Sequence, residues 1–282
     1  MHSALLTDGK VITAKAYEET LHGVRLSCID KSCGVPIIFI PESKEKEIVA
    51  HFRTSGKGAS IHKTGCGFAK KLSFSETVEK VTEYQASLRE QGIREFIVRL
   101  NLDSIDPDFV PKEVNREPND TEKEKSELDD KSLKESNPTP QSIGSLKAVK
   151  KLFTNVEPDL LASIIISVKG TKIPISELIR SNRDAHIALW QNKTMNLPYF
   201  IHGTVDKVIR REKVWYVNFE ASDASFFSLV VFEKHFKHFT FKDAELVGKN
   251  ILAYGYLKKN EFNKDRPATE MIIKSNRYLE FL

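Results

Sequence analysis

The chain has 282 residues, of which 40% are hydrophobic and 29% are charged, and its formal net charge is +4. This length and composition are ordinary for a soluble protein with two folded domains. The longest apolar run, residues 160–168, is about half of the roughly 18 residues that a membrane span needs. The sequence therefore excludes a membrane-spanning protein, and we expect no membrane partner.

The N-terminal residues 1–9 lack the positive head and the long apolar body of a secretory signal. We therefore expect a cytoplasmic location. Such a reducing compartment also suits thiolates that bind a metal.

The first predicted elements are short strands between residues 4 and 29, joined at Asp8-Gly9, a dipeptide typical of hairpin turns. The hairpin leads to Cys28 and Cys33, which four residues separate. An apolar strand is expected over residues 37–40. His62 and Cys66, which three residues separate, follow in a second short pair, and the chain has no cysteine outside this stretch.

Together Cys28, Cys33, His62 and Cys66 supply the Cys3His ligand set of a structural zinc site. Each short spacing lets two ligands turn back toward one point, while the insert between the pairs loops out. Four protein ligands leave no open position for water, so no catalytic zinc is implied. One alternative is three free, buried cysteines. A disulfide is a weaker alternative, because it would leave one of the three thiols unpaired. His51 is the alternative to His62 as the histidine ligand.

The same region resembles a known family. Residues 8–14, the first cysteine pair, residues 48–53 with their His51-Phe52 step, and the His62…Cys66 pair resemble the N-terminal zinc-finger region of CoiA-like competence proteins. The resemblance covers about the first quarter of the chain. It implies a protein that handles DNA, and in that family a nuclease core usually follows the finger.

Residues 75–91 carry apolar side chains at spacings of three and four, which predicts an amphipathic helix with Ser75 as N-cap and Gly92 at its end. Alternation over residues 93–102 predicts a strand. We therefore expect a zinc-binding α+β domain over residues 1–102.

Residues 103–140 hold five prolines, 12 acidic and 6 basic residues, a local charge of −6 that leaves +10 for the rest of the chain. Few apolar side chains are present to offset the entropy of ordering, so we predict an acidic disordered linker. Basic folded parts are compatible with a polyanionic partner, and ordinary solvated surface charge is the alternative.

A helical segment is predicted over residues 141–196. Its first helix is marked by buried-type side chains at helical spacing: Leu146, Val149, Leu152 and Phe153. The exposed face of that helix carries lysines that either solubilise it or contact phosphates: Lys147, Lys150 and Lys151.

No nuclease core can be recognised in this segment. A restriction-type metal site needs a carboxylate two residues before a lysine, and Lys169 lacks it. Asp184 and His186 form an isolated pair on a predicted helix. No catalytic residue is assigned.

Strands are predicted near residues 199–209, 213–219, 226–232, 247–257 and 270–273, with a short helix at 233–239. Five strands with a helix between the third and fourth is the order of an OB-fold, and residues 197–282 resemble its nucleic-acid-binding versions. Gly203, Gly248 and Gly255 suit its strand curvature. The fold class expected for the whole chain is therefore α+β, ending in a five-stranded OB-like barrel.

An OB-fold presents its second and third strands to the ligand. Alternation groups Trp215 with the more apolar face, so Trp215 is predicted in the core, while Tyr216 and Phe226 are predicted to stack on bases. The predicted nucleic-acid contacts are Arg210, Arg211, Lys213, Tyr216 and Phe226. An all-core aromatic set in a protein-binding barrel is the alternative.

These features predict a non-enzymatic nucleic-acid-binding protein, with single-stranded or unwound DNA favoured, acting in DNA uptake, repair or phage defence. Two other functions stay open. One is a metal-dependent nuclease of the CoiA-like group with an unrecognised active site, and the other is a protein-binding adaptor subunit of a larger assembly.

Overall fold

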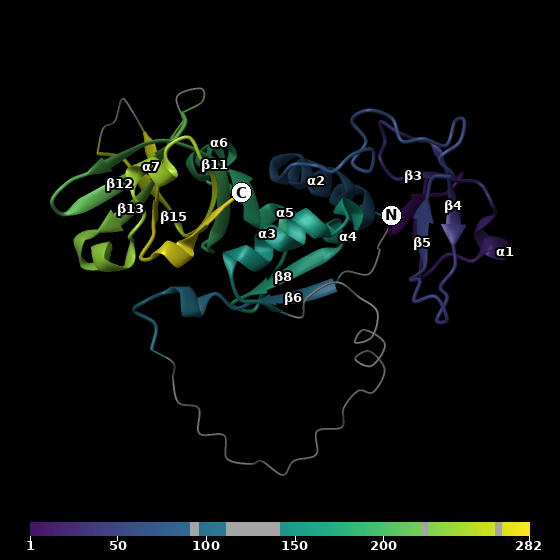
Figure 1. Cartoon of the computed structure of the whole chain (residues 1–282), viewed down its shortest axis with the longest axis horizontal. Coiled ribbons are helices and arrows are strands. Elements are labelled where there is room, and N and C mark those ends of the chain that lie inside the picture. The colour runs from purple at the N-terminus through teal and green to yellow at the C-terminus, as the bar shows by residue number, and fades with distance from the viewer. Residues whose placement is uncertain (91–95, 111–141, 222–224, 263–266) are drawn as a thin grey trace, which may run out of the picture.

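The computed structural model describes residues 1–90, 96–110, 142–221, 225–262 and 267–282. Three β-sheets follow one another along the long axis of the molecule, with the N-terminal sheet at one end and the C-terminal sheet at the other (Figure 1). Four helices lie together on one side of the middle sheet (Figure 1): α2 Phe74–Glu90, α3 Leu146–Asn155, α4 Pro158–Ala162 and α5 Ile175–Leu178. The mixed α+β class is confirmed.

The N-terminal sheet has five antiparallel strands in the order β2-β1-β3-β4-β5. Their bounds are β1 Ser3–Leu5, β2 Val11–Thr13, β3 Leu26–Cys28, β4 Pro36–Ile40 and β5 His51–Arg53. The short helix α1, Glu19–His22, lies between β2 and β3. The predicted hairpin is confirmed: Gly9 closes it with a φ of 82°, which glycine adopts without strain.

Helix α2, Phe74–Glu90, confirms the predicted amphipathic helix and buries Val81, Tyr84 and Leu88. Its N-cap is Ser73 rather than the predicted Ser75. The Ser73 amide donates to Glu76 Oε2 over 2.8 Å and the Glu76 amide donates to Ser73 Oγ over 3.3 Å, the reciprocal bonds of a capping box. The predicted end at Gly92 lies outside the described residues. None of the described helices combines the length and apolar character that a bilayer span requires.

The middle sheet has the order β7-β6-β8-β9. Its strands are β6 Phe96–Leu100, β7 Ser142–Ile143, β8 Ile164–Val168 and β9 Thr171–Pro174. Strand β6 pairs in parallel with β7 and β8, so the strand expected in the N-terminal domain joins a sheet with residues that follow the predicted linker. The division into domains at residues 102 and 141 stays a prediction.

Residues 142–196 differ from the helical segment expected there, because strands alternate with helices. The helices are α3 Leu146–Asn155, α4 Pro158–Ala162, α5 Ile175–Leu178 and α6 Asn182–Trp190. The run Ile164-Ile165-Ile166 forms strand β8, and all three side chains are buried. β-branched side chains favour a strand, and a strand covered on both faces shows a continuous apolar run rather than alternation.

The first residues of the predicted linker are ordered, which corrects that prediction for residues 103–110. Ile105 is buried at the end of the single turn η1, Asp103–Ile105, and its carbonyl accepts from Ser275 Oγ over 2.9 Å. Asp106 forms an ion pair of 2.6 Å with Lys274. Buried apolar surface and a cationic partner offset the entropy of ordering here. The remaining linker residues, 111–140, lie outside the described residues.

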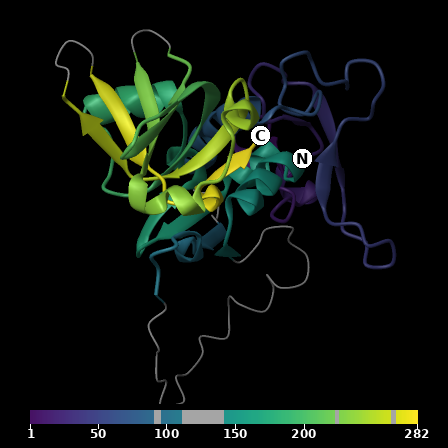
Figure 2. The ribbon, with the colours of Figure 1, turned by 60° about the vertical axis from the view of Figure 1, so that its left-hand side comes forward.

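The C-terminal sheet has eight strands in the order β15-β16-β13-β12-β11-β14-β17, with β10 beside β11. The strands are β10 Ile179–Ser181, β11 Tyr199–Arg210, β12 Val214–Phe219, β13 Phe226–Phe232, β14 Asn250–Gly255, β15 Leu257–Asn260, β16 Ala268–Ile272 and β17 Leu279–Phe281. The turns η2 Glu233–His238 and η3 Asn276–Tyr278 and helix α7 Asp243–Leu246 complete it. Figure 2 shows this sheet curving over the end of the molecule. No closed barrel is found among the described strands, so the five-stranded barrel is not confirmed.

Two of the glycines expected in these strands allow close approach of other side chains. A Cβ at Gly203 would lie 2.6 Å from Asn182 Oδ1, and one at Gly255 would lie 2.8 Å from Met271 Cγ. Both distances are shorter than carbon–oxygen or carbon–carbon contacts allow, so a larger residue would have to displace the side chain of Asn182 or Met271.

Candidate metal centre and the outer face of the C-terminal sheet

Two tight turns bring the four predicted ligands together. Cys28 ends β3, and the following turn is closed by the amides of Cys33 and Gly34, which both donate to the carbonyl of Asp30. In the second half-site the Cys66 amide donates to the carbonyl of Lys63 over 3.1 Å. Each pair of ligands is thus folded back locally, as the short spacings predict.

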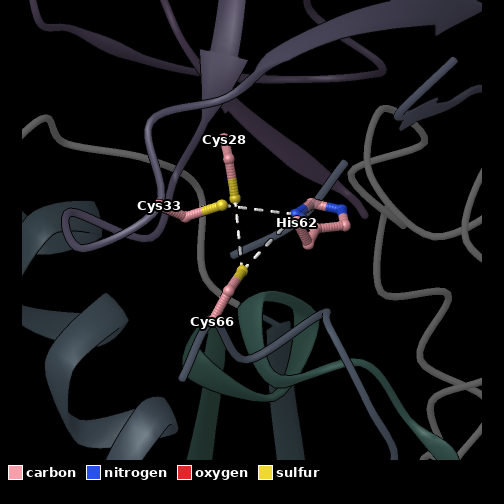
Figure 3. Close-up of side chains that lie close together, drawn as sticks. All are labelled: Cys28, Cys33, His62 and Cys66. Carbon is pink, nitrogen blue, oxygen red and sulfur yellow. Dashed lines mark hydrogen bonds between the residues drawn. The ribbon is translucent and has the colours of Figure 1, made fainter. Parts of the chain in front are cut away.

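The four side chains point toward one another (Figure 3). Cys28 Sγ lies 3.7 Å from Cys66 Sγ, and His62 Nδ1 lies 3.5 Å from Cys33 Sγ and 3.4 Å from Cys66 Sγ. All four ligand atoms lie within 4.8 Å of one another. The three sulfurs are buried, while the imidazole is half-buried at the rim.

These distances fit a tetrahedral metal ion. With metal–sulfur bonds of about 2.3 Å and metal–nitrogen bonds of about 2.0 Å, a tetrahedron has S–S edges of about 3.8 Å and S–N edges of about 3.5 Å. A disulfide would need about 2.05 Å between sulfurs, and the three cysteines are free. The cluster can therefore hold a metal ion.

His51 is not part of the cluster. Its Nδ1 lies 2.8 Å from the carbonyl oxygen of Val49, on the strand pair β4–β5. The choice between the two imidazoles, which the sequence left open, falls on His62.

The cluster itself favours a thiolate. The contact with Cys28 lowers the pKa of Cys66 to about 6, and the Phe68 amide also donates to Cys66 Sγ. The same contact, together with burial, raises the pKa of Cys28. A bound divalent cation would compete with the remaining protons, because metal ligation requires deprotonated thiols.

Asp30, which the sequence analysis missed, joins both half-sites to the rest of the fold. The side chain is fully buried. Oδ1 accepts from the Ser32 amide over 3.0 Å, while Oδ2 accepts from the Gly67 amide over 3.0 Å, from Tyr84 Oη over 2.7 Å and from Lys80 Nζ over 2.8 Å. One carboxylate thus fixes the first cysteine turn, the residue after the last cysteine, and helix α2.

Hydrogen bonds to Asp30 keep its carboxylate ionised despite burial. Burial is the largest single influence and opposes the charge, but the donors from Lys80, Ser32, Tyr84 and the Gly67 amide together outweigh it and hold the pKa of Asp30 well below its usual range. Burial, and then the adjacent carboxylate, raise the pKa of Tyr84, so the phenol stays a donor. A Cβ at residue 67 would clash with Tyr84 Oη, so a larger residue there would push the phenol away from Asp30.

A sequence signal for this contact exists, although it is weak. An acidic residue lies inside the first cysteine pair, and Tyr84 and Lys80 lie one turn apart on α2, where i and i+4 side chains share a face. A phenol and an ammonium on the buried side of a helix need a polar partner, because burying them unpaired costs several kcal/mol.

Arg210 is held differently from the prediction. Its guanidinium lies 4.0 Å from the ring centroid of Trp215 and donates to Asp243 Oδ1 and to the carbonyl of Phe241, each over 2.7 Å. Trp215 in turn stacks on Phe236 with ring centroids 3.8 Å apart. Arg210 therefore belongs to a packed end of the sheet rather than to a mobile turn, and Trp215 is half-buried rather than fully in the core.

Of the other predicted contacts, Tyr216 and Phe226 lie on the outer face of β12 and β13, while Arg211 and Lys213 lie in the turn between β11 and β12. Arg211 and Lys213 are exposed, and the Arg211 guanidinium lies 5.8 Å from the ring centroid of Tyr216. Tyr216 and Phe226 are half-buried. Tyr216 pairs with Val230, and Phe226 lies four residues before Val230 on the same strand. Tyr216 and Phe226 therefore point to the same face of the sheet.

The chain is matched by no protein-family model and by no curated protein.

Proposed function

We propose that this protein binds nucleic acid on the outer face of β12 and β13, and that a zinc ion held by Cys28, Cys33, His62 and Cys66 stabilises its N-terminal sheet. The observation that carries the binding proposal is the half-exposed Tyr216, with the Arg211 guanidinium 5.8 Å from its ring. An accessible aromatic ring beside an unshielded cation suits a base and its phosphate.

Zinc is the metal that this donor set favours. Three thiolates and one imidazole are soft to borderline ligands, which prefer zinc over magnesium or calcium. Four protein ligands leave no position for a substrate, so the ion would act in folding and not in chemistry.

Strand pairing supports an OB-type arrangement. Strands β11, β12 and β13 form an antiparallel meander, and β13 pairs in parallel with β16. Strand β14 pairs with β11, and β15, which begins after the single residue Tyr256, pairs with β16. If β14 and β15 act as one bent strand, that strand pairs with β11 at one end and with β16 at the other. It would then connect the first and last strands of a five-stranded OB barrel.

The surface around Tyr216 favours single strands. Ile209, Tyr216, Val230 and Ile272 form one row across four strands; Val230 is buried, and the three half-buried members leave Tyr216 as the ring on which a base could stack. Stacking of an unpaired base on such a platform contributes about 1–3 kcal/mol, and bases inside a duplex are not free to stack on it. Single-stranded or unwound DNA is the proposed ligand.

DNA as the partner, and DNA uptake, repair or phage defence as the setting, belong to the proposal through the motif resemblance of the N-terminal region to CoiA-like proteins. The Cys/His cluster gives the nuclease alternative no support, because its four protein ligands leave no open position for water or substrate. Binding without cleavage is therefore the function we propose.

The test is fluorescence anisotropy of the full chain with labelled single- and double-stranded DNA and RNA across a salt series. We expect single strands to bind most tightly, and Tyr216→Ala to weaken binding about tenfold, at the lower end of the stacking range. Tyr256→Ala is the matched control, because Tyr256 Oη contacts Lys169 of the middle sheet instead. No binding by the wild type, with stable protein partners in a pull-down, would favour the adaptor function.

A further inference from the structure

A cleft of about 410 Å³ opens beside the metal cluster. One wall comes from β5 and the loop around Cys66, and the other from the end of α3 and the start of α4. The polar side chains of the first wall include Arg53, His62, Lys70 and Lys71, and those of the second wall include Thr154 and Asn155. We call this the knuckle cleft.

The cleft carries positive charge that its own acids do not balance. Lys70 pairs with Glu76 over 3.0 Å, and Glu157 pairs with the N-terminal ammonium over 2.7 Å, so these charges cancel. Arg53 and Lys71 are exposed, and neither has a carboxylate within ion-pair distance among the described residues. Two cations therefore face the cleft without a counter-charge.

Neutral donors add to these cations. His62 directs Nδ1 at the sulfurs, so its other ring nitrogen points away from the cluster (Figure 3). A metal-bound imidazole donates through that second nitrogen, usually to a carboxylate, a carbonyl or water. The exposed amide of Asn155 supplies a further donor from the opposite wall.

A lysine stripe continues the cleft along α3. Lys151 and Lys147 precede Asn155 by four and eight residues, so the three side chains share one face of the helix, and both lysines are exposed. Lys150 lies off this stripe and donates to the carbonyl of Phe281 in β17 over 2.7 Å. Helix α3 itself contacts β14 and β17, so the stripe leads from the knuckle cleft toward the C-terminal sheet.

We propose that the knuckle cleft and the stripe of Lys147 and Lys151 bind the phosphodiester backbone of a nucleic-acid strand. This inference rests on the proposed function and adds a second contact to the one on β12 and β13. Of the phenylalanine rings that line the cleft, Phe52 and Phe153 are buried and Phe68 is half-buried, so the contact is to phosphates and carries no base preference.

The experiment compares two double variants of the full chain that lose the same charge. Arg53→Gln/Lys71→Gln changes the cleft, and Lys44→Gln/Lys46→Gln changes an exposed turn of the same N-terminal part. Each lost phosphate contact reduces the slope of log K against log salt by about 0.7 for single strands, so the cleft variant should lose about 1.4. If binding at 1 M salt is unchanged, affinity at 0.1 M salt then falls about 25-fold.

The outcomes separate this inference from the proposed function. If the cleft variant binds like the turn variant while Tyr216→Ala binds weakly, the cleft inference is overturned and the proposed function stands. A wild type that binds no oligonucleotide overturns both. Polyglutamate with the same charge as the oligonucleotide serves as a further probe. If it binds the wild type as tightly as the oligonucleotide does, and the cleft variant loses affinity for both equally, the phosphodiester assignment is overturned. Thermal melts of both variants establish that they fold.

Discussion

Replacing the buried carboxylate at the metal centre by its amide should loosen the N-terminal sheet. Asp30→Asn keeps the shape of the side chain but removes the charge that Lys80 Nζ meets at 2.8 Å. Both oxygens of Asp30 accept hydrogen bonds, so the NH2 group of asparagine would face a donor in either orientation of the amide. Removing one partner of a buried ion pair costs about 3–5 kcal/mol. Lys80 can still turn to Glu83, which lies 3.0 Å away, so we expect the lower end, about 3 kcal/mol.

Hydrogen exchange measured by mass spectrometry gives a local readout, because amides in β3 and β4 exchange when this region opens. A cost of about 3 kcal/mol raises exchange on the order of 100-fold, and zinc should pass to a chelator more readily. Glu83→Gln is the matched control, since it removes the partly exposed carboxylate partner of the same lysine and should cost at most about 1 kcal/mol. Equal exchange rates in the two variants would refute the reasoning.

Two further predictions concern the metal and pH. Elemental analysis of protein purified without chelator should give one zinc per chain, lost in Cys33→Ala and His62→Ala and retained in His51→Ala; absence of zinc from the wild type would reject the site. Burial lowers the pKa of His202 to about 4, so the folded chain keeps it neutral while the unfolded chain takes up a proton below its ordinary value near 6.5. Stability from this group is therefore full above pH 6.5 and is lost as pH falls toward 4, by about 2–3 kcal/mol at pH 4.5. Urea unfolding should show a smaller acid loss in His202→Gln than in the wild type or in His51→Gln, and an equal loss in all three would contradict it.

Local features of the sequence determined the ligands and much of the secondary structure. The spacings of Cys28/Cys33 and His62/Cys66 are set by turns of a few residues, so they identified the ligand pairs without knowledge of the fold. Period-two alternation likewise identified the inner face of β12, where Val217 and Phe219 are buried. The capping box at Ser73 is equally local, and the pattern Ser-x-x-Glu was available to find it.

Only the tertiary structure decided the contacts between distant residues. Asp30 meets Tyr84 across 54 positions, Arg210 meets Asp243 across 33, and β6 pairs with β8 across the predicted linker. Periodicity and spacing report which face of an element is buried, but not which distant partner covers it. The ligand set could therefore be predicted from the sequence, whereas the carboxylate that ties it to α2, the packing of Arg210 and the unbalanced charge of the knuckle cleft depend on how the elements pack together.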